Sequence, residues 1–286
     1  MPTQPRIGIT LGDVAGIGPE IVAKALASRK LDRRFDYEII GDPRTKRRAD
    51  AADWVAQGAH RCLSGELSGL VTAPISKQLL RDAGYRFEGH TELLAHIART
   101  KRFAMMLVGG ALRVALVTIH VPLSRVPRLL STKRIAEVIE LSHDACKRFG
   151  IRRPKIGVAG LNPHAGEGGL LGYEEQRIIA PAIRSAKRKG INVTGPWPAD
   201  TLFHKAYCGD FDAVVAMYHD QGLAPLKMIA FDSGVNLTLG LPFVRTSPDH
   251  GTAFDIAGKG IANPASMIAA INLAAQLSQR RKATKN

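Results

Sequence analysis

Cysteine is scarce in this chain of 286 residues, which contains only Cys62, Cys146 and Cys208. These three are too few and too widely spaced for a disulfide framework or for a CxxC metal site. The sequence also lacks the run of about eighteen apolar residues that a membrane-spanning helix needs, and its first residues, MPTQPRIGIT, lack the apolar stretch of a signal peptide. We therefore expect reduced thiols, a cytoplasmic location and no membrane partner.

Acidic residues are fewer than basic ones: 25 Asp and Glu stand against 40 Lys and Arg, a net charge of +15. Such a charge is typical of nucleic-acid-binding proteins, because Lys and Arg neutralise phosphates. The basic residues, however, fall in predicted helix ends and loops with little aromatic sequence among them: 29–48, 147–155, 184–189 and 279–286. This distribution favours a solvated surface that attracts anionic metabolites, with no nucleic-acid partner. A basic nucleic-acid-binding protein remains the alternative from a different class.

Strand and helix patterns alternate almost throughout the chain. Short runs rich in Val, Ile and Ala predict strands at 7–11, 37–40, 69–72, 105–108, 114–119, 156–161, 213–217 and 235–239. Longer amphipathic segments predict helices, notably at 20–27, 133–149, 173–189 and 265–277. The alternation predicts an α/β fold with a mainly parallel sheet. No Ser- or Pro-rich linker marks a domain boundary, so two lobes made from discontinuous segments remain possible.

Three of the apolar runs end on a histidine: VALVTIH on His120, GVAGLNPH on His164 and AVVAMYH on His219. Ligands of parallel sheets bind outside the carboxyl ends of the strands, so three imidazoles can meet in one crevice there. Imidazole is the commonest side-chain ligand of catalytic divalent metals, and three protein ligands leave positions open for water or substrate. The pattern therefore predicts a metal site, with three unrelated, hydrogen-bonded histidines as the alternative.

The sequence contains neither the GxGxxG nor the GxxxxGK[ST] loop, so no standard dinucleotide or triphosphate cradle is predicted. The glycine-rich stretch GDVAGIGPE, residues 12–20, is sufficiently explained by a tight strand-to-helix turn. A dense polar set follows the third histidine: YHDQG at 218–222, then Lys227, Asn236 and Arg245 within apolar sequence. A Lys and an Arg in such settings indicate an anion site. For Lys227, a side chain that extends along the surface is the alternative.

Nine ordered stretches together resemble the 4-hydroxythreonine-4-phosphate dehydrogenase family of the pyridoxal phosphate pathway: GDVAGIGPE, TAPISK, GHTELLA, VTIHVPL, LNPHAGEGG, PADTLF, AMYHDQGLAPLK, GVNLTLGLPFVRTSPDHGTA and DIAGKG. The resemblance extends from Ile7 to Leu277. The stretch HGTAFDIAGKGIANP also resembles the adenosine-binding loop of isopropylmalate and isocitrate dehydrogenases. This implies their non-Rossmann fold, a two-lobed α/β/α structure with a mainly parallel mixed sheet. We predict a first lobe with the nucleotide loop at 1–91 and 246–286, and a second lobe with the metal ligands and dimer interface at 92–245.

The resemblance implies roles for particular residues. A divalent metal (Zn, Mg, Co or Mn) would be held by three histidines of a homodimer, His120, His164 and His219, with His219 as the ligand that the partner subunit supplies. The positions that match the family's substrate-binding residues are His90, Thr91, Lys227, Asn236 and Arg245. The residues predicted to bind NAD are His250, Gly251, Thr252, Asp255 and Asn263.

Three of these assignments concern catalysis and specificity. Lys227 is the candidate for proton handling, because a lysine desolvated beside a cation can have a lowered pKa. Asp200 and Asp220 are rivals for orienting the histidines. Asp255 is the candidate for the ribose hydroxyl, where a carboxylate favours NAD over NADP.

The implied reaction is a metal-dependent oxidation by NAD of the C3 hydroxyl of 4-phosphohydroxy-L-threonine, followed by decarboxylation to 3-amino-2-oxopropyl phosphate. The metal would lower the pKa of that hydroxyl. Dehydrogenases of 4-phosphothreonate, of 4-phosphoerythronate or of an aromatic cis-diol carboxylate are alternatives within the fold. One departure from the family lies between Asp42 and Ala52, where a short basic link, PRTKRRADA, stands in place of a longer insertion.

Overall fold

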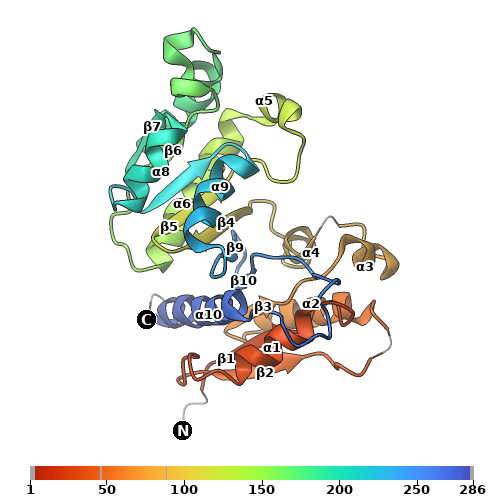
Figure 1. Cartoon of the computed structure of the whole chain (residues 1–286). Helices are drawn as coiled ribbons and strands as arrows, with labels where there is room; N and C mark the ends of the chain where they lie inside the picture. Colours follow the sequence, from red (N-terminus) through yellow and green to blue (C-terminus); the bar gives the residue numbers. More distant parts are fainter. Residues whose placement is uncertain (1–3, 46, 88, 284–286) are drawn as a thin grey trace. The chain divides into compact units, whose positions relative to one another are not determined.

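The computed structural model describes residues 4–45, 47–87 and 89–283, and the chain divides into two compact units (Figure 1). Unit 1 consists of Met1–Lys101 and Asp232–Asn286, and unit 2 consists of Arg102–Phe231. In the part of the chain that the structure describes, no helix is long and apolar enough to cross a membrane.

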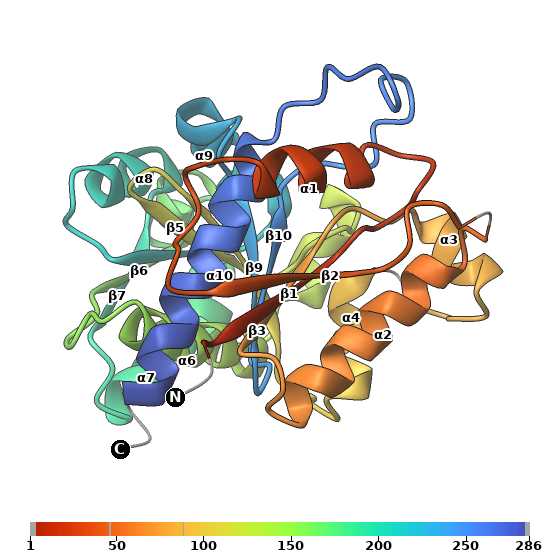
Figure 2. The ribbon, with the colours of Figure 1, turned by 90° about the horizontal axis from the view of Figure 1, so that it is seen from below.

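Unit 1 is built on five strands in the order β2 (Asp36–Ile40), β1 (Arg6–Thr10), β3 (Gly69–Thr72), β10 (Val244–Pro248) and β9 (Val235–Leu239). The first four run parallel to one another, and β9 is antiparallel to β10. The helices of this unit are α1 (Gly18–Leu26), α2 (Asp50–Leu63), α3 (Lys77–Asp82), α4 (His90–Ile97) and α10 (Ala265–Ala283). Figure 2 shows α1 beside α10 and α2 beside α4.

Side chains alternate between the two faces of the sheet in unit 1, and each face is covered by different helices. Leu70 of β3 belongs to the apolar cluster formed with α2, α3 and α4. Thr246 of β10 donates its hydroxyl to the carbonyl of Ala270 in α10 at 2.8 Å. Because side chains alternate between the two faces of a strand, Arg245 lies on the face of Leu70, with which it is in register. The parallel strands are therefore covered on both sides.

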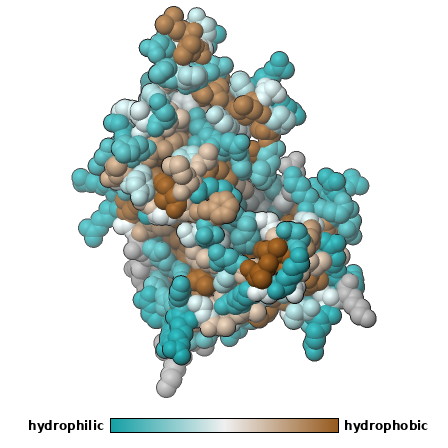
Figure 3. All heavy atoms as spheres, viewed as in Figure 1, coloured by the Kyte–Doolittle hydropathy of each residue, from teal (hydrophilic) through white to brown (hydrophobic). Residues whose placement is uncertain are grey.

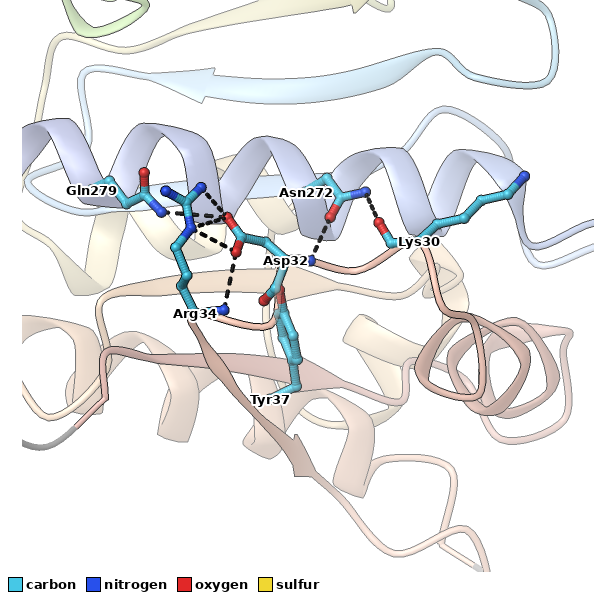
Figure 4. A network of polar contacts seen from close by, with 6 residues as sticks. All are labelled: Lys30, Asp32, Arg34, Tyr37, Asn272 and Gln279. Atoms are coloured by element: carbon cyan, nitrogen blue, oxygen red, sulfur yellow. Dashed lines mark hydrogen bonds and ion pairs between the residues drawn. The ribbon is translucent and has the colours of Figure 1, made fainter.

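A polar network ties the segment between α1 and β2 to α10 (Figure 4). The Asp32 carboxylate accepts the backbone N–H of Arg34 at 3.0 Å and its Nη2 at 2.7 Å. The backbone N–H of Asp32 donates to Oδ1 of Asn272 in α10 at 3.3 Å, and Nδ2 of Asn272 donates to the carbonyl of Lys30 at 3.0 Å. The Arg34 guanidinium lowers the pKa of the Asp32 carboxyl group. These residues contact one another within unit 1, so we infer that the network stabilises this unit.

Unit 2 is built on five strands in the order β4 (Ala104–Gly109), β5 (Leu112–Leu116), β8 (Ala213–Ala216), β6 (Ile156–Ala159) and β7 (Val193–Trp197). Only β4 and β5 are antiparallel. Its helices are α5 (Val126–Leu129), α6 (Thr132–Arg148), α7 (Ala180–Arg188), α8 (Ala199–Tyr207) and α9 (His219–Ala230). Every residue of β6 and β8 is buried, as expected for central strands covered on both faces.

The predicted α/β class with a mainly parallel mixed sheet is confirmed, and all eight predicted strands are present. Two strands, β7 and β10, were missed. The Gly195–Pro196 pair in β7 is typical of a turn, and β10 carries Arg245, Thr246 and Ser247 although it is buried throughout. The predicted helix 173–189 is divided between a π-helix, Glu175–Ile179, and α7. The C-terminal helix ends at Ala283, beyond the predicted residue 277.

The division between the units differs in its boundaries from the predicted lobes, which end at residues 91 and 245. The whole of α4 and the whole of β9 fall in unit 1, because α4 packs against α2 and β9 pairs with β10. Residues 92–101 and 232–245 therefore belong with the unit that carries the predicted nucleotide loop.

Candidate functional site

The three histidines follow three neighbouring strands of unit 2. β8 lies between β5 and β6, and the three strands are parallel. His120 follows β5, His164 follows β6, and His219 begins α9 just after β8. Because the carboxyl ends of parallel strands meet at one edge of a sheet, all three loops emerge at the same edge.

His120 and His219 are close neighbours in that edge. Their ring centroids are 5.4 Å apart. Two imidazoles bound to one tetrahedral ion, with metal–nitrogen bonds of about 2.1 Å, would have centroids about 5.2 Å apart. The Nδ1 atom of His219 lies 2.7 Å from Oδ1 of Asp220, a contact that orients the ring and leaves Nε2 as the nitrogen that could bind a metal. The pair therefore fits a divalent cation in both spacing and donor type.

A pocket of about 260 Å³ contains both imidazoles. Its other walls are Ile119, Val121, Leu123, Val126, Tyr218 and Asp220. A mainly apolar pocket with a few convergent polar groups is typical of a small-molecule site. The pocket therefore offers room for a ligand beside the two histidines.

His164 lies in a loop of unusual backbone conformation. It is exposed, and its φ of 51° begins a run of left-handed residues that continues through Ala165 (53°) and Glu167 (43°). Left-handed conformations cost free energy in residues other than glycine and occur preferentially at functional sites. The surrounding structure must therefore hold this loop in place.

The buried carboxylate of Glu175 supplies much of that support. Only 3% of Glu175 is exposed, and its Oε1 accepts the backbone N–H groups of Leu161 and Asn162, both at 2.8 Å. Its Oε2 accepts Nδ2 of Asn162 at 3.0 Å. Gln176 adds a contact from Nε2 to the carbonyl of Gly168 at 2.7 Å. Adjacent residues of the π-helix thus hold both ends of the loop, as π-helical turns often do at functional sites.

The described residues contain no group of three or more His, Cys, Asp or Glu side chains placed to hold a metal ion. Within one chain, the structure therefore brings together His120 and His219 but does not add His164 to them. The tip of the His164 loop is apolar, with Leu170 84% exposed and Tyr173 52% exposed. Brown side chains mark the corresponding end of unit 2 in Figure 3.

Of the two rival aspartates, Asp200 lies on α8, whereas Asp220 lies on α9 together with Lys227. Asp220 contacts His219 as described, whereas Oδ1 of Asp200 accepts the backbone N–H of Thr201 at 2.9 Å in the first turn of α8. Lys227 is half-buried on α9, with its Nζ 5.6 Å from the ring centroid of Phe231. Of the two aspartates, Asp220 is therefore the one placed to orient a histidine.

Unit 1 contains a buried positive charge, the guanidinium of Arg245. Arg245 is 2% exposed, and its Nη2 and Nε donate to Oγ1 of Thr72 at 2.6 and 3.2 Å, while Nη1 donates to Oγ1 of Thr238 at 3.0 Å. Burial lowers the pKa of Arg245 to about 10. No carboxylate among the described residues forms an ion pair with this guanidinium. The nearby Glu92 carboxylate raises the pKa of the guanidinium, but the hydrogen bonds of Arg245 go to hydroxyl groups, so its buried charge suits an anionic ligand.

The other predicted substrate residues of unit 1 also present polar atoms without partners. The Nε2 atom of His90 and the Oδ1 atom of Asn236 are buried, and neither meets a hydrogen-bond partner in the described part of the chain. Burial, and then the charge of Arg245, lower the pKa of His90 well below its usual value. Thr91 is 5% exposed in the first turn of α4. Such orphaned polar atoms indicate a place for a polar ligand.

The predicted nucleotide loop packs on the glycine-rich segment of unit 1. The backbone N–H of Ile17 donates to the carbonyl of Thr252 at 2.9 Å, and a Cβ on Gly16 would lie 2.7 Å from that carbonyl. Glycine at position 16 is therefore required by a close backbone approach. The glycine-rich segment supports the loop, consistent with its interpretation as a tight turn.

The five predicted NAD residues differ in their surroundings. Nε2 of His250 is buried without a partner among the described residues, while Nδ1 lies 3.1 Å from the carbonyl of Gly251. Asp255 is exposed. Oδ1 of Asn263 accepts the backbone N–H of Ala265 at 3.0 Å and caps the start of α10. His250 and Asp255 therefore remain available to a ligand, whereas Asn263 already has a structural partner.

The short basic link reaches toward the same region. The Arg48 guanidinium forms an ion pair with the fully buried carboxylate of Asp13 in the glycine-rich segment. It also lies 5.3 Å from the ring centroid of Phe254 in the predicted nucleotide loop. Arg48 thus connects the link to both segments.

Several residues that shape these sites are not predicted by the sequence motifs. Thr72 and Thr238 hold Arg245, and Glu175 and Gln221 hold the histidine loops. For the threonines, a signal existed, because each is a hydroxyl residue within a predicted buried strand. For Glu175 and Gln221, only the folded loop shows which backbone groups they reach.

The chain is similar to known proteins over nearly its whole length. Residues 18–274 match the family described as the pyridoxal phosphate biosynthetic protein PdxA. The chain is 44% identical to a 4-hydroxythreonine-4-phosphate dehydrogenase of Geobacter metallireducens, over 97% of this chain and 96% of the relative. It is 41% identical to a protein of Oceanobacillus iheyensis named "Putative D-threonate 4-phosphate dehydrogenase", over 97% of this chain and 99% of that relative.

Solved structures show the same relationships. A 4-hydroxythreonine-4-phosphate dehydrogenase from Klebsiella pneumoniae superposes with a TM-score of 0.84 at 39% identity, covering 97% of this chain and 99% of that chain. A terephthalate 1,2-cis-dihydrodiol dehydrogenase from Burkholderia xenovorans gives 0.70 at 28%, covering 95% and 98%. An isocitrate dehydrogenase from Methylococcus capsulatus gives 0.52 at 15%, covering 97% and 86%, and so shares the fold alone.

Proposed function

The chain belongs to the PdxA family of pyridoxal phosphate biosynthetic proteins, and on that premise we propose that it is a 4-hydroxythreonine-4-phosphate dehydrogenase. The reaction is the oxidation by NAD of the C3 hydroxyl of 4-phosphohydroxy-L-threonine, with decarboxylation to 3-amino-2-oxopropyl phosphate. The observation that carries this proposal is the buried Arg245 guanidinium, whose hydrogen-bond acceptors are hydroxyl groups. An enzyme whose substrate carries both a phosphate and a carboxylate needs a cationic side chain of this kind to bind one of these groups.

Arg245, His90 and Asn236 bind the anionic substrate in this proposal. Arg245 supplies the charge and a planar fork of donors suited to phosphate or carboxylate. The pKa of His90 is lowered, so at neutral pH its ring is uncharged and offers either a donor or an acceptor at the buried Nε2 atom. Thr91, at the start of α4, and Lys227 complete the set of substrate residues.

His120 and His219 are neighbours within one chain, so we propose these two as its metal ligands and the partner's His164, in place of the expected His219, as the third. A divalent cation held there would lower the pKa of a bound hydroxyl and stabilise negative charge, and NAD would supply the hydride acceptor. Zn, Mg, Co and Mn are the candidate ions, since three imidazoles accept each of them with different preferences. Asp220 orients His219 through Nδ1.

Lys227 is the proposed proton-handling residue, and Asp200 is the second candidate for orienting a histidine. A primary amine on a half-buried helix face can accept the hydroxyl proton and later return one to carbon. The residues assigned to NAD are His250, Gly251, Thr252, Asp255 and Asn263. The buried, unpartnered Nε2 of His250 supports this assignment for the loop, and the exposed carboxylate of Asp255 suits a ribose hydroxyl.

We also propose that the enzyme is a cytoplasmic homodimer with a composite active site and no nucleic-acid partner. The exposed apolar side chains of Leu170, Leu171 and Tyr173 on the His164 loop, and of Leu123 beside the histidine pocket, support this assembly. Exposed apolar patches next to polar functional groups are typical of subunit interfaces.

A second candidate substrate is 4-phosphothreonate, because the Oceanobacillus relative is named for D-threonate 4-phosphate and is nearly as similar as the Geobacter relative. 4-Phosphoerythronate is a further candidate of the same chemistry. An aromatic cis-diol carboxylate fits less well, since it carries no phosphate group.

Steady-state NADH formation with 4-phosphohydroxythreonine, 4-phosphothreonate and 4-phosphoerythronate tests the choice directly. We expect the highest kcat/KM with 4-phosphohydroxythreonine. A higher kcat/KM with another of the three would assign that acid as the substrate. Absence of NADH with all of them, in the presence of Zn, Co, Mn or Mg, would refute the proposal.

A further inference from the structure

One side chain, Gln221, joins two of the histidine-bearing loops of unit 2. It lies in the first turn of α9, two residues after His219. Its Oε1 accepts the backbone N–H of Met217 at 2.7 Å, and its Nε2 donates to the carbonyl of Gly160 at 2.7 Å. Met217 directly follows β8 and Gly160 directly follows β6. The amide thus connects the turn before His219 with the start of the loop that carries His164.

The same turn is joined to the third loop through Thr118. The hydroxyl of Thr118 donates to the carbonyl of Met217 at 2.8 Å, and its backbone N–H donates to the same carbonyl at 3.2 Å. Thr118 is buried and lies two residues before His120. A continuous set of hydrogen bonds therefore runs from Thr118 through Met217 and Gln221 to Gly160, across the ends of β5, β8 and β6.

The two contacts of Gln221 require opposite hydrogen-bonding roles in one side chain. The N–H of Met217 needs an acceptor, whereas the carbonyl of Gly160 needs a donor. A glutamine amide provides both, while a glutamate carboxylate at neutral pH provides acceptors only. The contact to Met217 is similar to a capping box, in which Gln or Glu near the helix start accepts a backbone N–H. The contact to Gly160 is an addition that capping does not need.

We propose that Gln221 is a positioning residue of the metal site, which fixes the His164 loop relative to the turn that presents His219. This inference rests on the proposed function, because it takes the histidines as metal ligands. In this role Gln221 acts through the backbone at Gly160 and Met217. The left-handed loop after Gly160 has strained residues, so an anchor at its first residue limits the positions that His164 can occupy.

The substitution Gln221→Glu separates the two contacts. It keeps the acceptor for Met217 and places a carboxylate oxygen against the carbonyl of Gly160. The matched control is Gln57→Glu, which makes the same change on the exposed face of α2 in unit 1. The measurement is the dissociation constant for Co²⁺, obtained by competition with a chelator on the intact dimer. We expect Gln221→Glu to raise this constant by about 10- to 100-fold, a typical effect of losing a group that supports metal ligands. Gln57→Glu should leave it unchanged.

A second substitution, Gln221→Met, has a similar length and neither polar group. It removes the chance that an introduced carboxylate itself binds Co²⁺, and we expect a weakening at least as large. The melting temperature of the metal-free protein is measured alongside. A merely structural role for Gln221 would lower that temperature and leave the Co²⁺ dissociation constant unchanged well below it.

The outcomes separate this inference from the proposed function. If the wild-type protein binds Co²⁺, His219→Ala does not, and both Gln221 variants bind as tightly as wild type, the positioning role is overturned while the metal site stands. If the wild-type protein does not bind Co²⁺, or His219→Ala binds it equally well, the histidine metal site is refuted and the inference fails with it.

Discussion

Arg245 places a guanidinium inside unit 1 with hydroxyl groups as its hydrogen-bond acceptors. The free energy cost of burying it is offset in part by Thr72 and Thr238, which together accept three of its N–H bonds. The hydroxyl dipoles do not neutralise the buried charge, and the Glu92 carboxylate, which raises the pKa of the guanidinium, forms no ion pair with it among the described residues. Arg245 is therefore the residue that most favours the proposal of an anionic substrate.

Arg245→Ala should raise KM for the phosphorylated substrate, because a charge-assisted hydrogen bond contributes about 1.5–3 kcal/mol, or roughly 10- to 150-fold in KM. The exposed Arg29→Ala variant is the control and should match wild type. KM is compared between the phosphorylated substrate and its dephosphorylated analogue. Equal increases for both would show that Arg245 binds another part of the substrate.

His90 makes stability depend on pH. Its pKa in the folded chain lies well below the ordinary 6.5 because of burial and of Arg245. Below pH 6.5 the unfolded chain therefore binds a proton that the folded chain does not, and stability falls as pH decreases toward the folded pKa. The loss from this residue is at most about 1.4 kcal/mol per pH unit.

His90→Gln should reduce the slope of unfolding free energy against pH between 6.5 and 5, measured by urea unfolding. The exposed His60→Gln variant on α2 should retain the wild-type slope. A slope in His90→Gln as steep as in wild type would mean that other groups, such as the partly buried His143, whose pKa is also lowered, account for it.

At the scale of elements, the π-helix Glu175–Ile179 and the loop before it support each other through hydrogen bonds. The helix contributes a buried carboxylate, and the loop contributes backbone N–H groups that point toward it. A regular α-helix from 173 to 189, as the sequence predicts, would place Glu175 in a different register from these N–H groups. The wider turn at this point thus serves the loop that carries His164.

Two glycines of that loop provide a matched test of its packing. Gly166 has a φ of +83°, and a Cβ there would lie 2.7 Å from Oε2 of Glu175; Gly168 has a φ of +66° with open space around it. Alanine at either position costs about 1–2 kcal/mol for the left-handed conformation. Gly166→Ala should cost about 1–3 kcal/mol more, because the methyl group displaces the buried carboxylate.

Calorimetry measures this difference in stability as a difference between the melting temperatures of the two variants. For a protein of this size, each kcal/mol corresponds to about 2–4 °C, so Gly166→Ala should melt several degrees below Gly168→Ala. Equal melting temperatures would show that Glu175 moves without cost and does not hold the loop.

For the whole molecule, the arrangement of the histidines bears on assembly. His120 and His219 are neighbours in one chain, and the described residues of that chain offer no third ligand to complete a group. Supply of the third ligand by the partner's His164 would make each active site composite. A lone subunit would then hold the metal with two ligands and bind it weakly.

Mixing inactive His120→Ala protein with inactive His164→Ala protein, under conditions of subunit exchange, should restore activity. One site of each mixed dimer then has all three ligands, so recovery approaches about a quarter of wild type when half the dimers are mixed. The control mixture, His120→Ala with His219→Ala, should stay inactive. Each site would take both of these ligands from the same chain, and no chain in this mixture has both. Recovery in the control mixture alone would instead assign His219 to the partner.

The chain is also shorter than its relatives. The alignment with the Geobacter protein spans 327 positions, whereas this chain has 286 residues, so at least 41 of those positions are gaps here. The basic link after β2 is where the sequence indicates a missing insertion. In the structure, Arg48 of this link contacts Asp13 and Phe254, so the short link has its own place beside the predicted nucleotide loop.

The sequence by itself determined the α/β class, the positions of eight strands and the placement of three histidines after strands. These properties are local, because hydrophobic periodicity and turn residues act over a few neighbouring positions. The same locality explains the errors. In β10, burial comes from neighbouring strands and helices, so its polar residues Arg245 and Thr246 concealed a strand that is buried throughout.

Only the tertiary structure decided which side chains meet. The pairing of His120 with His219, the hydroxyl groups around Arg245, and the reach of Glu175 and Gln221 to loop backbones all join residues that are distant in sequence. Such contacts depend on strand order and on loop conformation, which no short segment specifies. For the same reason the sequence could propose three ligands for one metal, but only the fold shows that a single chain brings two of them together.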